Sequence, residues 1–360
     1  MPTTWTVTKS GGGGDYNTLA SALSNGSTID GDTIEIQGTW AARDTAVCTV
    51  SDAVTIQCDA DSKQVGRPWR TGDTHYQHRS TSGHSFTVTD TGTVTFIDLD
   101  IQNAATGVSD EIFRNNVSNT FVAERCVLGF DSRTDQQDIY YNDAILDVTF
   151  TNCVGYNAYR AWVDSNGGDT GSVVNINSCT AYDIGFNATT NSRSGLIGFN
   201  SSNTMTANVA NTLAHTNASS KTCTFVSANT TYNFHTLITN VDNLAAGSGT
   251  AGASNTANVI NATINATDTL GNYIVTDIVS PYNLLLQDSA TNNAALTNHS
   301  ITSFTGTGLT LPTLDILGQT RVTTTSNIDI GAHAIVAAGV GATPKGVFNK
   351  PFFGPFGGPL

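Results

Sequence analysis

Five eight-residue segments of the chain share one pattern of apolar and polar positions. Apolar or small residues fill the first, third and sixth places, and polar residues usually fill the second and fifth. Successive segments begin 27, 27, 26 and 33 residues apart. Self-similarity at a period between about 20 and 50 residues is typical of a solenoid. The five segments are Val94–Ile101, Phe121–Leu128, Val148–Gly155, Val174–Ala181 and Ala207–Ala214.

The alternation within each segment has a period of two, which indicates a half-buried strand rather than a helix. One such strand in each unit, with further short strands and Gly, Asn and Asp turns between, predicts an all-β, right-handed, single-stranded parallel β-helix. Because successive coils pair about 4.8 Å apart, inward side chains at equal positions should stack into ladders. The two predicted ladders are Leu99, Cys126, Cys153, Cys179 and Thr212, and Phe96, Ala123, Phe150, Ile176 and Val209.

The ends of the chain are predicted to differ from this repeating body. Residues 1–30 should form an N-terminal strand and a short capping helix, because apolar side chains recur at helical spacing in Tyr16–Asn25 and Asp15 is placed to cap the first turn. Such a helix closes the exposed end of a solenoid core. Residues 31–338 should form the parallel β-helix, and residues 339–360 an extended Gly/Pro/Phe tail.

A polar, basic and histidine-rich stretch at about residues 59–85 is predicted to leave the β-helix as a loop. Its histidines, His75, His78 and His84, and its Asp73 are residue types that bind metals. Their spacing matches no compact metal motif, so we predict a solvated or interface loop, no metal and no cofactor.

The balance of charges narrows the function classes. The 360 residues include 29 acidic and 15 basic ones, and the formal net charge is −14. A nucleic-acid-binding protein normally shows a basic stripe, and none occurs, so we predict no nucleic-acid partner. No apolar run reaches the ~18 residues of a membrane span, and the first residues lack the pattern of a secretion signal. We therefore expect no membrane partner and a protein that is made and assembled inside a cell.

Six cysteines occur, and three of them, Cys126, Cys153 and Cys179, occupy one position of the repeat. This regularity predicts stacked, buried thiols, because an unpaired cysteine behaves as a small hydrophobe. A disulfide between Cys48 and Cys58 stays open as an alternative in an oxidising compartment.

Segments at both ends of the chain carry a resemblance to a known family. They are Val7–Ala22, Tyr282–Ala290 (Tyr-Asn-Leu-Leu-Leu-Gln-Asp-Ser-Ala), Asp315–Arg321 (Asp-Ile-Leu-Gly-Gln-Thr-Arg) and Asp329–Ala332 (Asp-Ile-Gly-Ala). They resemble the opening and closing segments of pectate-lyase-like right-handed β-helix proteins, which end on a leucine-rich strand, an Asp-x-x-Gly-x-x-Arg turn and an Asp-Ile-Gly-Ala-aromatic-Glu strand.

The resemblance frames nearly the whole chain, from about Trp5 to Ala338, and implies the β-helix fold. His333 and Ala334 stand where the family has its aromatic residue and its Glu. The family includes lyases, hydrolases, esterases, adhesins and phage spikes, so the resemblance implies no single function.

Enzymes on this fold act on carbohydrates with two carboxylates, or with aspartate-bound calcium and an arginine base, on an exposed strand face. Glu124 and Arg125 lie one coil from Asp98, so these three side chains are predicted to cluster. The neighbouring coils carry Asn152 and Ser178 at the equivalent place, and such a polar ladder needs no catalytic explanation. The weak catalytic candidates are Asp98, Glu124, Arg125 and Asp147.

Aromatic residues offer a second possible surface function. Exposed aromatic side chains make platforms for sugar or protein, and buried core or turn positions are the alternative. The residues concerned are Tyr140, Tyr141, Tyr156, Tyr159 and Trp162.

The last residues, 340–360, cannot form a helix or a ladder strand, because Pro and Gly are too frequent there. Exposed apolar clusters usually mark partner sites, so we predict that this segment docks on a neighbour; folding back along its own β-helix is the alternative. The predicted partner-binding residues are Phe348, Phe352, Phe353, Phe356 and Leu360.

These observations favour a structural, non-enzymatic bacteriophage virion protein, located in the virion after synthesis in the host cytoplasm. Its predicted partners are other virion proteins of the capsid or tail, with head decoration favoured. A homotrimer and a host surface glycan are further predicted possibilities. The rival functions are a carbohydrate-binding or polysaccharide-degrading tailspike and a secreted β-helix adhesin.

Overall fold

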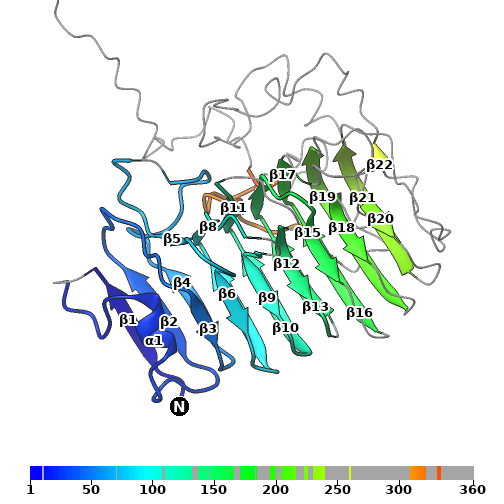
Figure 1. Ribbon diagram of the computed structural model, residues 1–360. Helices are drawn as coiled ribbons and strands as arrows, with labels where there is room; N and C mark the ends of the chain where they lie inside the picture. Colours follow the sequence, from blue (N-terminus) through cyan, green and yellow to red (C-terminus); the bar gives the residue numbers. More distant parts are fainter. Residues whose placement is uncertain are drawn as a thin grey trace, which may run out of the picture.

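Parallel strands of successive coils pair side by side along the body of the molecule (Figure 1). They form a 15-stranded sheet, here called sheet A, and a 7-stranded sheet, here called sheet B. The computed structural model describes residues 1–9, 12–69, 71–107, 110–131, 137–144, 146–165, 171–182, 184, 195–199, 204–215, 223–225, 230–239, 259–260, 309–321 and 331–333.

Sheet A consists of a long limb and a short limb. The long limb contains β1 (Thr4–Thr8), β2 (Thr33–Gln37), β4 (Thr55–Cys58), β7 (Thr93–Ile97), β10 (Asn119–Glu124), β13 (Leu146–Thr151), β16 (Ser172–Asn177), β19 (Met205–His215), β21 (Thr230–Thr239) and β22 (Val259–Ile260). The short limb contains β5 (Gln77–Ser80), β8 (Asp100–Asn103), β11 (Val127–Phe130), β14 (Val154–Tyr156) and β17 (Thr180–Tyr182).

Sheet B supplies the third side of each coil. Its strands are β3 (Cys48–Val50), β6 (Phe86–Val88), β9 (Phe113–Asn115), β12 (Asp138–Asn142), β15 (Ala161–Ser165), β18 (Gly195–Phe199) and β20 (Cys223–Phe225). A coil therefore runs from sheet B to the long limb and then to the short limb, as in β9, β10 and β11. Phe121 pairs with Val94 in the preceding coil and with Val148 in the next. This register is the 27-residue step of the sequence, and it confirms the predicted parallel β-helix.

In the first four coils the repeated eight-residue segment is not one strand, as the alternation predicts, but two strands joined at a bend; in the fifth coil it lies within β19, which pairs with both β16 and β17. The fifth residue of the segment adopts a left-handed backbone conformation in every coil, with φ between 48° and 63°. This conformation turns the chain from the long limb to the short limb, and only Asn and Asp among non-glycine residues adopt it readily. The five bend residues are Asp98, Arg125, Asn152, Ser178 and Asn211.

Both predicted ladders are confirmed, and the residues after the bends form the first of them. All ten side chains of the two ladders are fully buried. The backbone N–H of Cys126 lies 3.4 Å from Sγ of Cys153, and that of Cys153 lies 3.4 Å from Sγ of Cys179. Burial raises the pKa of Cys126 and Cys153 well above the ordinary thiol value.

The cysteines whose side chains the structure describes are all free thiols. This confirms the prediction of unpaired, buried thiols at the repeated position. Cys48 and Cys58 are among them, so the alternative disulfide between these two residues does not form. Cys223 belongs to β20, but its side chain lies outside the described part.

Aromatic rings from sheet B and the long limb fill the centre of the coils. Neighbouring ring centroids lie 4.7 to 6.2 Å apart from Phe86 to Trp162. These spacings are those of edge-to-face and tilted aromatic pairs. The rings belong to Phe86, Phe96, Phe113, Phe121, Tyr140, Phe150 and Trp162.

A short helix covers the first coils, as the sequence predicts, but it is smaller and begins later. Helix α1 comprises Leu19–Leu23, and its N-cap is Thr18, whose side chain accepts a hydrogen bond from the N–H of Ser21. Asp15 is not the cap: it accepts hydrogen bonds of 2.8 and 2.9 Å from the N–H and hydroxyl of Thr6. The carboxylate of Asp15 is thus committed to β1.

The stretch at 59–85 contains a strand that its polar composition does not predict, although its described residues before position 77 form neither helix nor strand. Strand β5 lies inside it and begins the short limb, with Gln77 paired in register with Asp100. His75 and His78 are buried rather than solvated. Polar residues occur here because the chain packs against polar outer positions of β8, so polarity does not signal exposure.

A segment from the far end of the sequence returns to the flank of the short limb, where Figure 1 draws it in orange. Residues 309–321 and 331–333, here called the strap, contact positions from Gln64 to Asn211 instead of adding a last coil. The contacts are Gln64 Nε2 to Ile316 O (2.6 Å), Asn152 Nδ2 to Leu314 O (2.7 Å), Asn177 Nδ2 to Thr310 O (2.7 Å), Ala332 N to Thr180 Oγ1 (3.0 Å) and Gly331 N to Asn211 O (2.9 Å).

The Asp and Arg of the Asp315–Arg321 motif hold the strap together. Asp315 is buried and accepts hydrogen bonds of 2.9 and 2.7 Å from the N–H groups of Leu317 and Gln319. Arg321 is also buried and donates to Oδ1 of Asn152 and to the carbonyl oxygens of Gly331 and Ala332 at 2.6 to 3.0 Å. The motif therefore has a structural explanation.

Candidate functional site

Three of the four predicted catalytic candidates cluster at the bends of sheet A, as the sequence predicts. Arg125 donates from Nε and Nη2 to the two carboxylate oxygens of Asp98, at 2.8 and 3.1 Å. A third guanidinium nitrogen of Arg125 contacts the carboxylate of Glu124. Burial opposes the charge of Arg125, but the hydrogen bonds and the negative charges of both acids raise its pKa above the ordinary value.

This arrangement fits a structural role better than a catalytic one. Asp98 and Arg125 are bend residues, and their side chains are joined in a two-pronged ion pair across adjacent coils. A general acid or a metal-binding carboxylate needs free lone pairs or a free proton, whereas the guanidinium of Arg125 takes up both oxygens of Asp98.

Asp147 lies apart from the other candidates. It is exposed near the beginning of β13 and accepts a hydrogen bond of 3.0 Å from the hydroxyl of Thr120 on the neighbouring strand. Glu124 is the last residue of β10, four positions beyond Thr120. At about 3.3 Å per residue, this separates the two carboxylates by roughly 13 Å along the strands, so they cannot act on one atom.

The aromatic residues considered as a glycan platform are mostly in the core. Tyr140, Tyr156 and Trp162 are almost fully buried, and Tyr141 is buried as well. Gly129 shows how closely they pack, because a Cβ at this position would lie 2.3 Å from the ring of Tyr156 on the next coil. The core alternative is therefore correct for Tyr140 and Trp162, whereas Tyr141 and Tyr156 are buried outside the core cluster.

The three histidines of the 59–85 stretch face different surroundings and do not converge. His75 lies 3.2 Å from Asp100, and the ring of His78 packs in the core against Phe86. His84 contacts the carboxylate of Glu111. Within the described ranges, no three His, Cys, Asp or Glu side chains are grouped closely enough to hold a metal ion.

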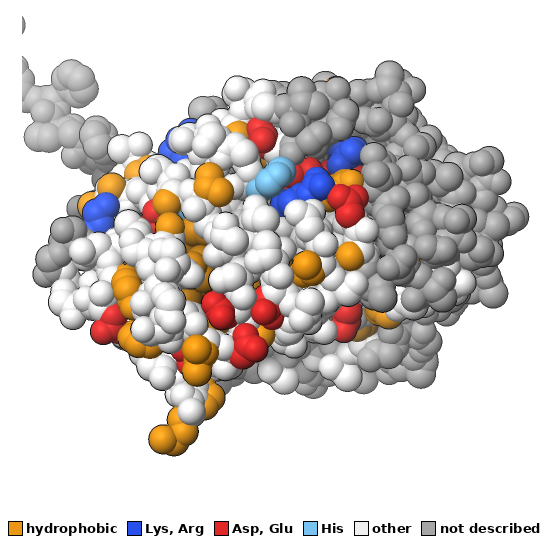
Figure 2. Space-filling model, turned by 60° about the horizontal axis from the view of Figure 1, so that its bottom comes forward, with side chains coloured by type: hydrophobic (Ala, Val, Ile, Leu, Met, Phe, Trp, Pro, Cys, Tyr) orange, Lys and Arg blue, Asp and Glu red, His pale blue; other side chains and the backbone are white. Residues whose placement is uncertain are grey.

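Sequence reasoning missed a second polar cluster, on the outer face of sheet B. Charged side chains are sparse on this protein, and Figure 2 shows them gathered in small groups on one face. The cluster on sheet B, here called the sheet B cluster, consists of His84, Glu111, Arg114, Asp138, Tyr141, Asp143, Arg160 and Asp164.

Strand register brings the members of the sheet B cluster together. Tyr141 on β12 pairs with Arg114 on β9 and with Asp164 on β15. Glu111 lies just before β9 and Asp138 is the first residue of β12. The N–H of Ile112 donates to the carbonyl of Asp138 at 3.1 Å. Glu111 and Asp138, like Arg114 and Tyr141, are 27 residues apart. The sequence period therefore contained the signal that places them side by side.

Arg160 is the buried centre of the sheet B cluster. Its Nε lies 2.8 Å from Oδ2 of Asp138, and its Nη2 lies 2.7 Å from Oδ2 of Asp164. All three side chains are buried. Burial opposes the charge of Arg160, but the carboxylates of Asp138 and Asp164 outweigh this and raise its pKa. Arg160 therefore stays charged, and its loss would remove a buried positive charge from beside two buried carboxylates.

The ring of Tyr141 lies between two guanidinium groups. The guanidinium carbon of Arg114 is 4.2 Å from the ring centroid, and that of Arg160 is 5.5 Å away. The hydroxyl of Tyr141 donates to Oδ1 of Asp143 at 2.6 Å. Burial, followed by this bond to a carboxylate, raises the pKa of Tyr141 to about 12. Tyr141 is thus a neutral hydrogen-bond donor at physiological pH.

Glu111 is the least satisfied member of the cluster. It is fully buried, and within the described part of the chain neither of its carboxylate oxygens receives a hydrogen bond of normal geometry. Nη1 of Arg114 lies 3.6 Å from one oxygen, and Nδ1 of His84 contacts the other. A buried carboxylate with unused acceptor capacity is costly.

The remaining site predictions concern residues outside the described part of the chain. The predicted partner-binding residues Phe348, Phe352, Phe353, Phe356 and Leu360 lie outside the described residues, as does the segment Tyr282–Ala290. Within the described ranges, no helix has the length and apolar character needed to cross a membrane.

The comparisons with known proteins give a structural likeness but no sequence match. No family model matches the chain, and no curated protein matches it in sequence. Among solved structures, the crystal structure of pectate lyase Pel9A is similar, with a TM-score of 0.42 and 12% sequence identity over 93% of this chain and 96% of that chain. The fold assignment therefore stands on the strand register described above.

Proposed function

We propose that this chain is a structural, non-enzymatic protein of a bacteriophage virion, which attaches through residues 347–360 to other virion proteins. The observation that carries the proposal is the ion pair of Arg125 with Asp98 and Glu124. Asp98 and Glu124, the two acids that the sequence offers as a catalytic pair, are both ion-paired with Arg125, and the pair of Asp98 with Arg125 joins neighbouring coils. What remains is a rigid rod with stacked side-chain ladders, suited to a durable surface component.

The sequence of residues 347–360 supports attachment through this segment. Four phenylalanines stand among three prolines and three glycines, with Lys350 as the single charged side chain. Proline limits the conformational entropy that docking removes, and buried aromatic side chains are the usual anchors of an interface. A capsid protein is the favoured partner under this proposal, and a tail protein is the other virion partner.

Co-sedimentation with purified particles that lack this protein tests the attachment. Full-length protein should pellet with the particles, and the full-length variant with Phe352→Ser, Phe353→Ser and Phe356→Ser should stay in solution. Val65→Ser, which removes an exposed hydrophobic side chain of the body, is the matched control and should pellet normally. Pelleting of the triple variant at the wild-type level would refute attachment through this segment.

The sheet B cluster favours a second candidate function, the recognition or cleavage of a host surface polysaccharide. The supporting observation is Glu111, a buried carboxylate with unused acceptor capacity beside the ring of Tyr141 and two guanidinium groups. Carboxylates, guanidinium groups and an aromatic side chain are the groups that hold hydroxyl-rich sugars.

A depolymerisation assay on a panel of bacterial polysaccharides separates the two functions. The structural proposal predicts inert protein. Chain shortening that is lost in Glu111→Gln but kept in Asp98→Asn would establish the second function at the sheet B cluster. Chain shortening that is lost in Asp98→Asn or Glu124→Gln would overturn the structural role assigned to the Arg125 ion pair.

A further inference from the structure

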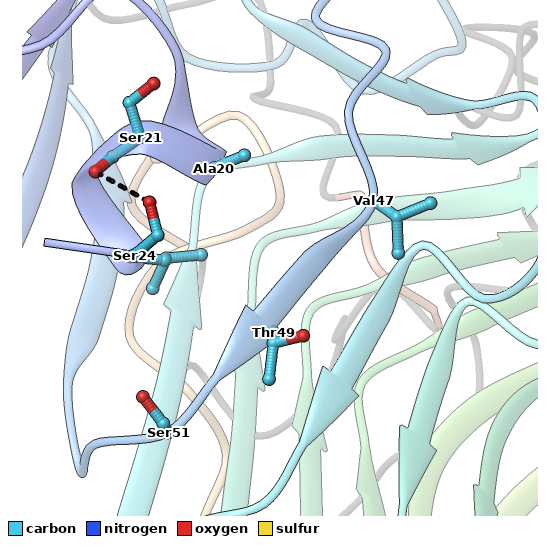
Figure 3. Close-up of a pocket in the computed structure, with 7 residues that line it drawn as sticks. Ala20, Ser21, Ser24, Val47, Thr49 and Ser51 are labelled. Atoms are coloured by element: carbon cyan, nitrogen blue, oxygen red, sulfur yellow. Dashed lines mark hydrogen bonds between the residues drawn. The ribbon is translucent and has the colours of Figure 1, made fainter.

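A groove lies between helix α1 and strand β3, at the N-terminal end of the solenoid (Figure 3). Its volume is about 340 Å³. The helix contributes one wall and the edge of sheet B the other. The lining residues are Ala20, Ser21, Leu23, Ser24, Val47, Thr49 and Ser51.

The groove is preformed because both of its walls are anchored. Leu19, Ala22 and Leu23 of α1 are buried in the core, and the N–H of Leu19 donates to Oδ2 of Asp44 at 3.0 Å. Strand β3 is the last strand of sheet B in the described structure and pairs with β6. Figure 3 shows the side chains of Val47, Thr49 and Ser51 along one side and those of Ser21 and Ser24 on the helix opposite.

The lining of the groove suits an uncharged, partly apolar peptide. None of the seven lining side chains is charged, and four of them carry hydroxyl groups that can bond to peptide N–H and C=O groups. Val47 stands at the rim with 46% of its surface exposed, one of few large hydrophobic side chains exposed on the described surface. An apolar cavity of about 150 Å³ holds a benzene molecule, so this groove has room for a phenylalanine ring and its neighbours.

We propose that the groove receives the segment 347–360 of a second copy of the chain. The inference rests on the proposed function, in which residues 347–360 attach the protein to its partners. It adds that, between two copies of the chain, these residues bind in the groove. The segment is rich in phenylalanine and nearly uncharged, which matches the uncharged groove. Proline residues favour an extended segment without internal hydrogen bonds, which leaves peptide N–H groups for the hydroxyl oxygens of Thr49 and of Ser24, whose own proton is donated to the carbonyl of Ser21.

The strap and the groove lie on different sides of the body, and the proposal takes the occupant from a second copy. The last described residues, 331–333, lie against Thr180 and Asn211 on the short limb. The groove opens on another side, between α1 and sheet B in the first coils. The residues from 334 to 360 span at most roughly 90 Å when extended, enough to leave one molecule and enter the next. Such head-to-tail contact is heterologous and closes into a ring or continues as a chain of subunits.

Self-association of the full-length protein, measured by mass photometry and sedimentation velocity, tests the proposal. Val47→Glu places a charge at the rim of the groove, and Val65→Glu makes the same change at an exposed valine elsewhere on the body. Loss of one buried valine and gain of a charge should weaken self-association by about tenfold or more. Wild type and Val65→Glu should therefore form oligomers at concentrations where Val47→Glu is monomeric with an unchanged melting temperature.

Photo-crosslinking identifies the occupant and its source. A photoreactive phenylalanine analogue at position 352 of the full-length protein should crosslink to residues 47–51. In an equal mixture of ¹⁴N- and ¹⁵N-labelled chains, the crosslinked peptides should include mixed-isotope pairs. Crosslinks within single chains only, crosslinks to other surfaces, or equal self-association of Val47→Glu and wild type would each overturn the inference.

The particle assay keeps this inference separate from the proposed function. If Val47→Glu loses self-association but still pellets with particles, both the groove and the particle attachment stand. If Val47→Glu self-associates as wild type does while the triple phenylalanine variant fails to pellet, the groove inference fails and the proposed function survives. Pelleting of the triple variant overturns the proposed function alone.

Discussion

Replacing Phe121 by Ala tests the packing of the aromatic core most severely. Phe121 is fully buried at the centre of β10. Its ring centroid lies 4.8 Å from that of Phe113, 4.7 Å from Tyr140, 5.5 Å from Phe96 and 5.8 Å from Phe150. It therefore connects two sheets and three successive coils, and no neighbouring side chain can move to fill its space without losing its own contacts.

The expected loss of unfolding free energy is at least about 5 kcal/mol. Removal of a buried phenylalanine side chain costs about 3 to 5 kcal/mol, and the cost rises with the volume left empty. Each aromatic pair adds about 0.5 to 1.5 kcal/mol beyond the area that it buries, and Phe121 takes part in four pairs. Phe121→Leu keeps most of the volume and loses the ring contacts, so we expect a smaller loss of about 2 kcal/mol.

Guanidinium denaturation followed by circular dichroism measures these losses. Val122→Ala is the matched control, because Val122 is the next residue on β10 and points to the opposite face; we expect it to cost less than about 1 kcal/mol. The order of stability should be wild type, Val122→Ala, Phe121→Leu and then Phe121→Ala. A loss below about 2 kcal/mol for Phe121→Ala, or a loss equal to that of Val122→Ala, would refute the packing described here.

Further predictions concern the strap, the sheet B cluster and the cysteine ladder. Arg321→Ala should expose the strap, so amide hydrogen exchange at residues 313–321 should rise at least about tenfold while β10 stays protected; equal protection would show that Arg321 does not hold the strap. Absorbance titration should place the pKa of Tyr141 at about 12. Asp143→Asn should lower that pKa towards 10, because the hydrogen bond to a carboxylate is lost. In the wild type, the stability that the neutral phenol contributes should be present below about pH 10 and disappear as the pH rises from about 10 to 12. Because burial raises the pKa of their thiols, Cys126 and Cys153 should resist iodoacetamide at pH 8 in the native protein and react in denaturant; rapid native labelling, read by peptide mass spectrometry, would contradict their burial.

The strand register could be predicted from the sequence because it repeats. The 27-residue steps placed Phe121 beside Val94 and Val148, and both ladders followed from this spacing. The bend inside each repeated segment was missed, although the apolar positions change phase there, from the first and third places to the sixth. Asn152 and Asn211 are residue types that adopt left-handed backbone conformations, but Arg125 and Ser178 at the same position gave no such indication.

The 27-residue period could also have predicted part of the sheet B cluster. Glu111 and Asp138, and likewise Arg114 and Tyr141, are separated by the 27-residue period, but their segments are short and less alike than those of the long limb. Arg160 could not be placed in this way, because its coil has a different length. Its ion pairs with Asp138 and Asp164 depend on the loop before β15.

The strap is the part of the fold that lay furthest beyond sequence reasoning. Asn152 and Leu314 are separated by 162 residues, and Gln64 and Ile316 by 252. No periodic pattern joins such positions, and backbone carbonyl acceptors carry no sequence signal. The resemblance to β-helix proteins marked Asp315–Arg321 as a closing motif without indicating which surface it covers.

Cryo-electron microscopy of purified particles, with and without added full-length protein, tests the central claim most directly. The account predicts additional elongated density on the particle surface, joined to a virion protein through residues 347–360, and no such density for the triple phenylalanine variant. Density that contacts the particle through the outer face of sheet B, or equal density for the triple variant, would contradict attachment through this segment.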